Sequence, residues 1–195
     1  MSTLTNGLPE TLLRAAEEAY ARPVRAYHSW AHVQEVLRHL SLVPRWEHPR
    51  EVALAALFHD AIYEAGRADN EVKSAGLAAE AIERFLPPAS VDVAYVRRLI
   101  ELTARHGKLD DEALDDDARH FLDADMAILG SAPETFDAYD AGIATEYAHV
   151  PKLIFQFNRR RFLKRLLESP RIFLSDLFHQ RLDAAARANL RRALR

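Results

Sequence analysis

The chain has 195 residues, of which 49% are hydrophobic and 28% charged, and its formal net charge is −3 at pH 7. These values are typical of one globular domain with a full hydrophobic core, and they provide no general electrostatic attraction to nucleic acid. The absence of cysteine excludes disulfides and thiolate metal sites, so a metal would need His, Asp, Glu or water as ligands.

Helical periodicity covers nearly all of the chain, and no segment alternates as a β-strand does. In chain order the expected helices are residues 9–21, 29–43, 49–63, 70–86, 90–106, 117–130, 133–150, 151–167 and 183–194. Ser29 and Asn70 are expected N-caps, and Gly107 and Gly130 follow helix ends. Residues 49–63 are apolar almost all round, which predicts a central buried helix. Residues 64–69, 106–116 and 169–180 are expected to be irregular, within one all-α domain spanning residues 1–195.

Targeting signals are not visible in the sequence. The start, MSTLTNGLPE, has neither the charged nor the apolar region of a secretory signal. No apolar run approaches the roughly 20 residues that a membrane span requires. We therefore expect a cytoplasmic protein that does not enter a membrane.

Histidines and aspartates that border or interrupt the apolar helices are the strongest functional signal. In RAYHSWAHV, His28 and His32 are four residues apart, a spacing that within a helix places both rings on one face. Because His28 precedes the expected cap Ser29, we expect His32 alone to be a metal ligand. His59 and Asp60 end the apolar run VALAALF, where a buried histidine and aspartate are costly unless they are paired or bound. Asp125 lies in FLDADMAIL, again beside apolar residues. His32, His59, Asp60 and Asp125 are candidate ligands of one divalent ion, of which Mn, Fe, Co, Ni, Zn and Mg suit such a mixed set.

The order His32, His59–Asp60 and Asp125 resembles the H…HD…D signature of the HD-domain metal-dependent phosphohydrolases. The segments RAYHSWAHV, ALFHDAIY, DNEVKSA, LTARH, FLDADMAILG, EYAHV and ARANL look like a subgroup of predicted HD phosphohydrolases of about 200 residues, and the resemblance runs from about residue 10 to the C-terminus. It implies a helical bundle with a central metal and hydrolysis of a phosphate ester or anhydride, often of a nucleotide. Asp123 is then expected to orient a ligand histidine.

Further candidates for catalysis and substrate binding surround these ligands. A phosphohydrolase needs a carboxylate that positions or deprotonates the attacking water. Glu71 is the first choice, and Asp69 and Glu64 are the others. The candidate substrate contacts are Arg25, His28, Asn70, Lys73 and His106. Arg25 is chosen because a guanidinium can hold a phosphate with two hydrogen bonds.

Two positions depart from the subgroup pattern. Ala144 replaces an arginine that usually precedes the EY pair, and Asn158 replaces a glycine before Arg159. If the missing arginine contacts phosphate in the subgroup, its loss weakens substrate binding here, and if it serves only a structural ion pair, little changes. The alternative is therefore a catalytically weak nucleotide-binding or regulatory module on the same fold.

Other classes find less support. A di-metal oxidase needs paired Glu-x-x-His motifs on helices, and a zinc protease needs His-Glu-x-x-His, whereas this chain has HSWAH. The C-terminal arginines recur with apolar residues at helical spacing, as in an amphipathic face. The expected partner is thus a small phosphorylated substrate, with a nucleotide preferred, and neither nucleic acid nor membrane. A homodimer is compatible with the sequence.

Overall fold

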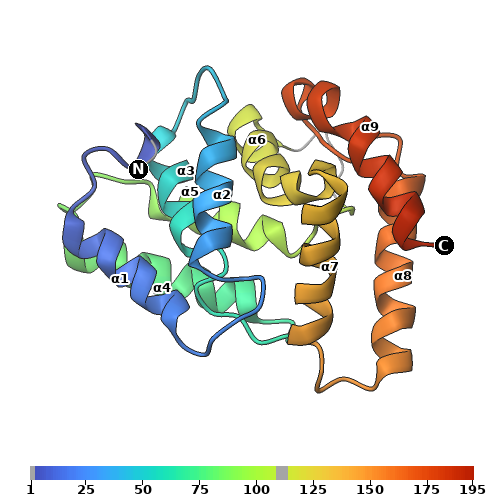
Figure 1. Ribbon diagram of the computed structural model, residues 1–195. Coiled ribbons are helices and arrows are strands. Elements are labelled where there is room, and N and C mark those ends of the chain that lie inside the picture. Colours follow the sequence, from blue (N-terminus) through green and yellow to red (C-terminus); the bar gives the residue numbers. More distant parts are fainter. Residues whose placement is uncertain (1–2, 109–113) are drawn as a thin grey trace. The chain divides into compact units, whose positions relative to one another are not determined.

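All secondary structure in the computed structural model is helical over the residues that it describes, 3–108 and 114–195 (Figure 1). The elements are η1 (Thr3–Thr5), α1 (Glu10–Ala21), α2 (Trp30–Leu40), α3 (Pro49–Phe58), α4 (Asn70–Phe85), α5 (Val93–Thr103), α6 (Asp116–Asp125), η3 (Met126–Gly130), α7 (Pro133–Glu146), α8 (Lys152–Glu168) and α9 (Asp176–Ala193). The all-α prediction is confirmed. Contacts between Cα atoms divide the chain into two compact units, Met1–His106 and Gly107–Arg195. The single domain spanning residues 1–195 stays a prediction.

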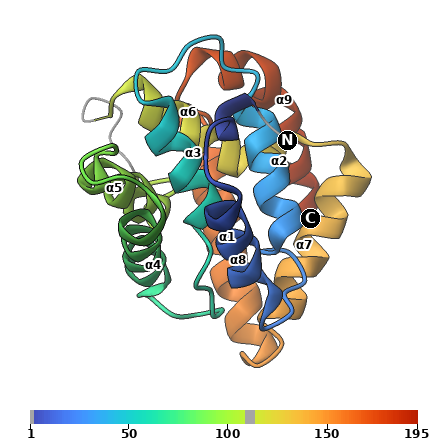
Figure 2. The ribbon, with the colours of Figure 1, turned by 90° about the vertical axis from the view of Figure 1, so that its left-hand side faces the viewer.

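The first unit is built around α3, whose residues Val52–Phe58 are all buried. This confirms the expected central helix, because a helix that is apolar on every side can only lie inside the core. Helices α1, α2, α4 and α5 all contact α3, and α4 also lies along α5 (Figure 2). The metal-ligand candidates at the end of α3 thus follow a fully buried helix.

Helix α3 ends earlier than the expected helix of residues 49–63. Its last residue is Phe58, because a hydrogen bond to a distant side chain replaces one of the hydrogen bonds that would continue the helix. The Asp60 amide, which would donate to the Ala56 carbonyl in a continued helix, donates to the Tyr20 hydroxyl at 3.2 Å instead. The Ala56 carbonyl lies 2.9 Å from His59 Nδ1. The chain therefore turns at His59 and Asp60, and both residues lie outside α3.

The second unit packs α9 against η3, α8 and α6. Residues 169–180 were expected to be irregular, but α9 begins within them, at Asp176. The reason is a cap: Ser175 Oγ accepts a hydrogen bond from the Phe178 amide. Close packing against η3 occurs at Gly130, where an added Cβ would lie 2.7 Å from Leu182 Cβ. The predicted irregular segment 106–116 lies partly outside the described residues.

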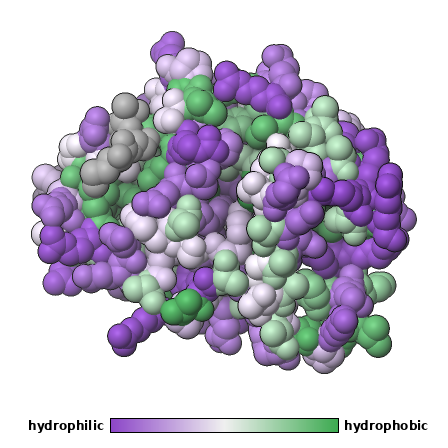
Figure 3. Space-filling view, viewed as in Figure 1, coloured by the Kyte–Doolittle hydropathy of each residue, from purple (hydrophilic) through white to green (hydrophobic). Residues whose placement is uncertain are grey.

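Helix α8 exposes apolar and cationic side chains together. Leu153, Ile154 and Phe157 in its first turns are exposed, and Arg160 and Arg161 follow them. Figure 3 shows hydrophobic surface over the end of α8 where these residues lie. The amphipathic face inferred from the spacing of the C-terminal arginines does not describe these first turns of α8, because their apolar side chains are exposed and the buried ones, Leu163 and Leu166, come later in the helix. None of the helices in the described part of the chain is both long and apolar enough to cross a bilayer.

Candidate metal centre

Three of the four predicted metal ligands meet inside the first unit. His32 comes from α2, while His59 and Asp60 occupy the turn that follows α3. The two Nε2 atoms of His32 and His59 are 3.1 Å apart. Asp60 Oδ2 lies 3.1 Å from His59 Nε2 and 3.6 Å from His32 Nε2. Both imidazoles are buried, so these donor atoms face one another away from bulk water.

The separations fit a shared metal ion. Nitrogen and oxygen ligands bound to one ion at about 2.1 Å lie roughly 3.0–3.4 Å from each other, depending on the coordination geometry. The three measured distances of 3.1, 3.1 and 3.6 Å fall at or near that range. Two imidazole nitrogens and one carboxylate oxygen also form the mixed donor set that divalent transition metals accept. This group can therefore hold a metal ion.

A backbone contact sets the tautomer of His59. Its Nδ1 lies 2.9 Å from the Ala56 carbonyl oxygen, which can only accept, so the ring proton is assigned to Nδ1. Nε2 then carries the lone pair that points toward His32 and Asp60. Metal-ligating histidines commonly donate their other ring nitrogen to a carbonyl in this way. The end of α3 thus prepares His59 as a ligand.

Arg25, predicted to contact phosphate, is bonded to the turn that contains His59 and Asp60. Its Nη1 donates to the carbonyl oxygens of His28 and Asp60, and its Nη2 donates to that of Ala61 at 2.9 Å. The guanidinium carbon also lies 5.4 Å from the centre of the Tyr20 ring. Much of the donor capacity of Arg25 is therefore used on backbone, which favours positioning of Asp60 over a two-point phosphate contact.

Asn70, another predicted substrate contact, closes the loop that follows Asp60. Its Oδ1 accepts from the Glu64 amide at 3.1 Å, and its Nδ2 donates to the Glu64 carbonyl at 2.9 Å. Ser74, on the next turn of α4, makes the same pair of contacts with the Ile62 backbone. Asn70 is the first residue of α4 and not its cap, since the N-cap is Asp69. Both side chains thus anchor residues 62–64.

The predicted catalytic carboxylates differ in their surroundings. Asp69 accepts from Arg67 twice at 2.8 Å and pairs with Lys73 at 2.8 Å, and these bonds hold its pKa well below the usual range. A carboxylate held so firmly in its ionised form is a weak proton acceptor. Glu64 is exposed and pairs with Arg67. Glu71 is half-buried and makes no ion pair or hydrogen bond through its side chain within the described residues.

The remaining substrate candidates in the first unit are two histidines, His28 and His106, and Lys73. His28 stacks on Tyr63 with ring centres 3.9 Å apart, and its ring centre is 6.0 Å from that of His32. It therefore lies beside the metal-ligand candidates without contributing to them. His106 is half-buried and follows the end of α5, with its amide donating to Thr103. Lys73 is exposed on α4 and paired with Asp69, so two of the predicted cationic phosphate contacts have partners within the protein.

Asp125, the predicted fourth ligand, belongs to the second unit, where it is the half-buried last residue of α6. Within that unit its charge acts on Tyr139, whose hydroxyl is hydrogen-bonded to Arg159. Burial raises the pKa of Tyr139, and Arg159 only partly opposes this rise. Arg159 also donates to Asp140 at 2.8 Å. The role of Asp125 as a metal ligand together with His32, His59 and Asp60 stays a prediction.

Asp123, which is predicted to orient a ligand histidine, accepts hydrogen bonds from the Leu174 and Ser175 amides, each at 2.7 Å, and from Ser175 Oγ at 2.6 Å. It therefore anchors the segment that starts α9.

The two departures from the subgroup pattern, Ala144 on α7 and Asn158 on α8, are both exposed.

Two supporting residues were missed from the sequence. Tyr20 ends α3 through its hydroxyl, and Ser74 holds Ile62. Tyr20 looked like one more apolar residue of the first helix, and its hydroxyl gave no sequence signal. Ser74 sits inside an alanine-rich helix, where a fully buried serine requires a hydrogen-bond partner. That polar interruption was a usable signal.

The chain was compared with family models, with curated proteins and with solved structures, and no match was found. The site therefore rests on its own geometry and on the motifs of the sequence.

Proposed function

We propose that this chain is a metal-dependent phosphohydrolase that cleaves a phosphate ester or anhydride of a small molecule, with a nucleotide as the preferred class. The observation that supports it is the convergence of His32, His59 and Asp60 donor atoms within 3.1–3.6 Å of one another in a largely buried site. The same three residues are the first members of the sequence signature. Asp125 is the fourth ligand in this proposal.

The residues of the chain have separate tasks in this reaction. His32 and His59 provide neutral nitrogen donors, and Asp60 provides the negative charge that attracts a cation. A divalent ion bound there would lower the pKa of a water molecule and offset charge on a phosphoryl oxygen. Arg25 and Tyr20 hold the turn that aims Asp60, and both imidazoles are buried.

Glu71 is the proposed carboxylate that accepts the proton of the attacking water. It is half-buried, it lies in the first turn of α4, and it is not neutralised by an arginine or lysine as Asp69 is. Glu71→Gln should keep bound metal and slow turnover, because the amide cannot accept the proton. Unchanged turnover would remove Glu71 from this role.

Elemental analysis of the purified chain, followed by phosphate release from a panel of phosphorylated metabolites with Mn²⁺ present, tests the proposal. Asp60→Ala should lose both bound metal and phosphate release while keeping its helical circular dichroism. Glu80→Ala, an exposed carboxylate on α4, is the matched control and should change neither. Metal retained by Asp60→Ala would contradict the ligand assignment. Asp125→Ala, assayed in the same way, tests the fourth ligand separately.

A nucleotide-binding module without turnover is the second candidate. The observation that favours it is that Arg25, Lys73 and Asn70 already bond to the protein itself, which leaves fewer groups for a transferred phosphoryl. Nucleotide binding without phosphate release, measured with Mn²⁺ across the same panel, would select this alternative.

A further inference from the structure

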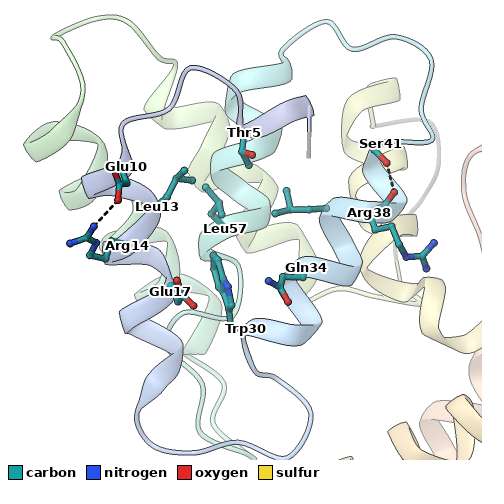
Figure 4. A pocket seen from close by; sticks show the side chains of 11 residues that line it. Thr5, Glu10, Leu13, Arg14, Glu17, Trp30, Gln34, Arg38, Ser41 and Leu57 are labelled. Carbon is teal, nitrogen blue, oxygen red and sulfur yellow. Dashed lines mark hydrogen bonds and ion pairs between the residues drawn. The ribbon is translucent and has the colours of Figure 1, made fainter. Parts of the chain in front are cut away.

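A cavity of about 620 Å³ opens between α1 and α2, away from the metal-ligand candidates. Leu57 of α3 forms part of its wall, and Trp30 stands in the middle of the lining in Figure 4. Its volume is in the range of small-molecule sites. All of its lining residues belong to the first unit.

This cavity is a different site from the metal centre. Trp30, Gln34, Leu37 and Ser41 follow one another at intervals of three or four, so they share one face of α2. His32 comes two positions after Trp30, about 200° around the helix, and therefore points to the opposite side. A ligand in the cavity would contact α2 without touching the donor atoms.

The lining combines aromatic and aliphatic side chains with two kinds of polar group. The first kind is already paired, Arg14 with Glu10 at 2.7 Å and Arg38 with Glu35 at 2.8 Å. The second kind has no partner. The Glu17 carboxylate, the Gln34 amide and the Trp30 indole N–H make no hydrogen bond or ion pair within the described residues.

All three of these groups line the cavity. Figure 4 shows Glu17 of α1 and Gln34 of α2 on either side of the Trp30 ring. Leu13 and Leu57 add apolar surface beside the ring. Because the arginines of the lining are paired, the uncompensated charge that a ligand would meet is the carboxylate of Glu17.

We propose that this cavity binds an organic amine that carries an ammonium group on a compact apolar body. The ammonium donates to the Glu17 carboxylate and is attracted by the face of the Trp30 ring on that side. The apolar body lies on Trp30, Leu13 and Leu57. An anionic ligand is disfavoured by Glu17, and a neutral one leaves that carboxylate without a partner.

Phenethylamine is a suitable probe, with phenethyl alcohol and phenylacetate as its neutral and anionic analogues. The chain has two tryptophans, so Trp46→Phe leaves Trp30 as the reporter. We expect saturable quenching of Trp30 fluorescence by phenethylamine, and binding at least tenfold weaker for both analogues. Higher salt should weaken the binding, since the recognised carboxylate is exposed to solvent.

Glu17→Gln is the decisive variant, because it removes the charge while keeping the shape. It should weaken phenethylamine binding about tenfold, as expected for the loss of a charge-assisted hydrogen bond. Glu18→Gln, an exposed neighbour that does not line the cavity, should bind as the unaltered chain does. Asp60→Ala should also bind normally, so this result is independent of the proposed hydrolase activity. Equal binding of phenethyl alcohol, or no effect of Glu17→Gln, would overturn the proposal.

Discussion

At the scale of single residues, the candidate metal centre depends on a side chain that does not itself offer a ligand atom. Arg25 bonds to the Asp60 and Ala61 carbonyls, two groups that the end of α3 leaves without helical partners. A planar guanidinium can reach several acceptors at once, whereas an ammonium group acts from one point. Arg25 therefore sets the direction in which Asp60 is presented.

Arg25→Lys should lower metal affinity by about tenfold or more, the range typical of groups that orient metal ligands. Titration of Mn²⁺ by calorimetry measures the effect. Arg22→Lys, an exposed arginine three residues earlier, should leave the affinity unchanged. If Arg25 instead contacts phosphate, as the sequence suggested, metal affinity would be normal and the KM for substrate would rise.

His39 should make folding dependent on pH. Burial is the largest cause that lowers its pKa from 6.5 to about 4, and Arg38, whose Nη2 lies 2.9 Å from the ring Nε2, adds to it. The unfolded chain therefore binds a proton near pH 6.5 that the folded chain takes up only near pH 4. The contribution of His39 to the free energy of unfolding is therefore fully present above pH 6.5 and is lost as the pH falls toward 4.

Urea unfolding at several pH values between these limits tests the sign. His39→Gln should flatten the decline in the free energy of unfolding, because the glutamine does not titrate. A decline of the same slope in the variant would assign the pH dependence to other groups.

At the scale of elements, periodicity located helices such as α2 and α5, whose apolar faces repeat at helical spacing, and the continuous apolar run located α3. It failed where tertiary contacts decide. α3 stops at Phe58 because Tyr20, 40 positions from Asp60 in sequence, takes the Asp60 amide. Likewise α9 starts at Asp176 with Asp123 bonded to the two residues before it. Partners this far apart leave no local pattern.

The residues of the candidate site, like the helices, could be predicted where they leave a local pattern in the sequence. His32, His59 and Asp60 were found because polar residues at the border of apolar runs stand out, and the structure brings them together. The role of Asn70 was not found, since an asparagine before a helix is equally typical of a cap. Only the fold shows its amide bonded across six residues to the backbone of Glu64.

Asn70→Ala tests this loop anchor. The variant leaves the Glu64 amide and carbonyl without their partner, which should cost about 1–3 kcal/mol in the free energy of unfolding. Denaturant unfolding measures it. Lys73→Ala, which breaks only an exposed ion pair, should cost less than about 1 kcal/mol. Unaltered stability of Asn70→Ala together with a raised KM would restore Asn70 as a substrate contact.

At the scale of the whole molecule, the unfolding of the first unit can be followed separately. His32, His59 and Asp60 all lie in this unit, as do both tryptophans, Trp30 and Trp46. Tryptophan fluorescence therefore reports the unfolding of the unit that carries these three residues, whereas circular dichroism reports the helices of both units. A ligand that binds only the folded state stabilises it by mass action.

Mn²⁺ should raise the midpoint of thermal unfolding followed by tryptophan fluorescence, and a chelator should reverse the rise. At a free ion concentration about 100 times the dissociation constant, the stabilisation is roughly 2.7 kcal/mol. Asp60→Ala should abolish the shift, because it removes the charged donor between the two imidazoles. A shift of equal size in Asp60→Ala would mean that Mn²⁺ binds elsewhere, and no shift in the unaltered chain would contradict a metal held by His32, His59 and Asp60.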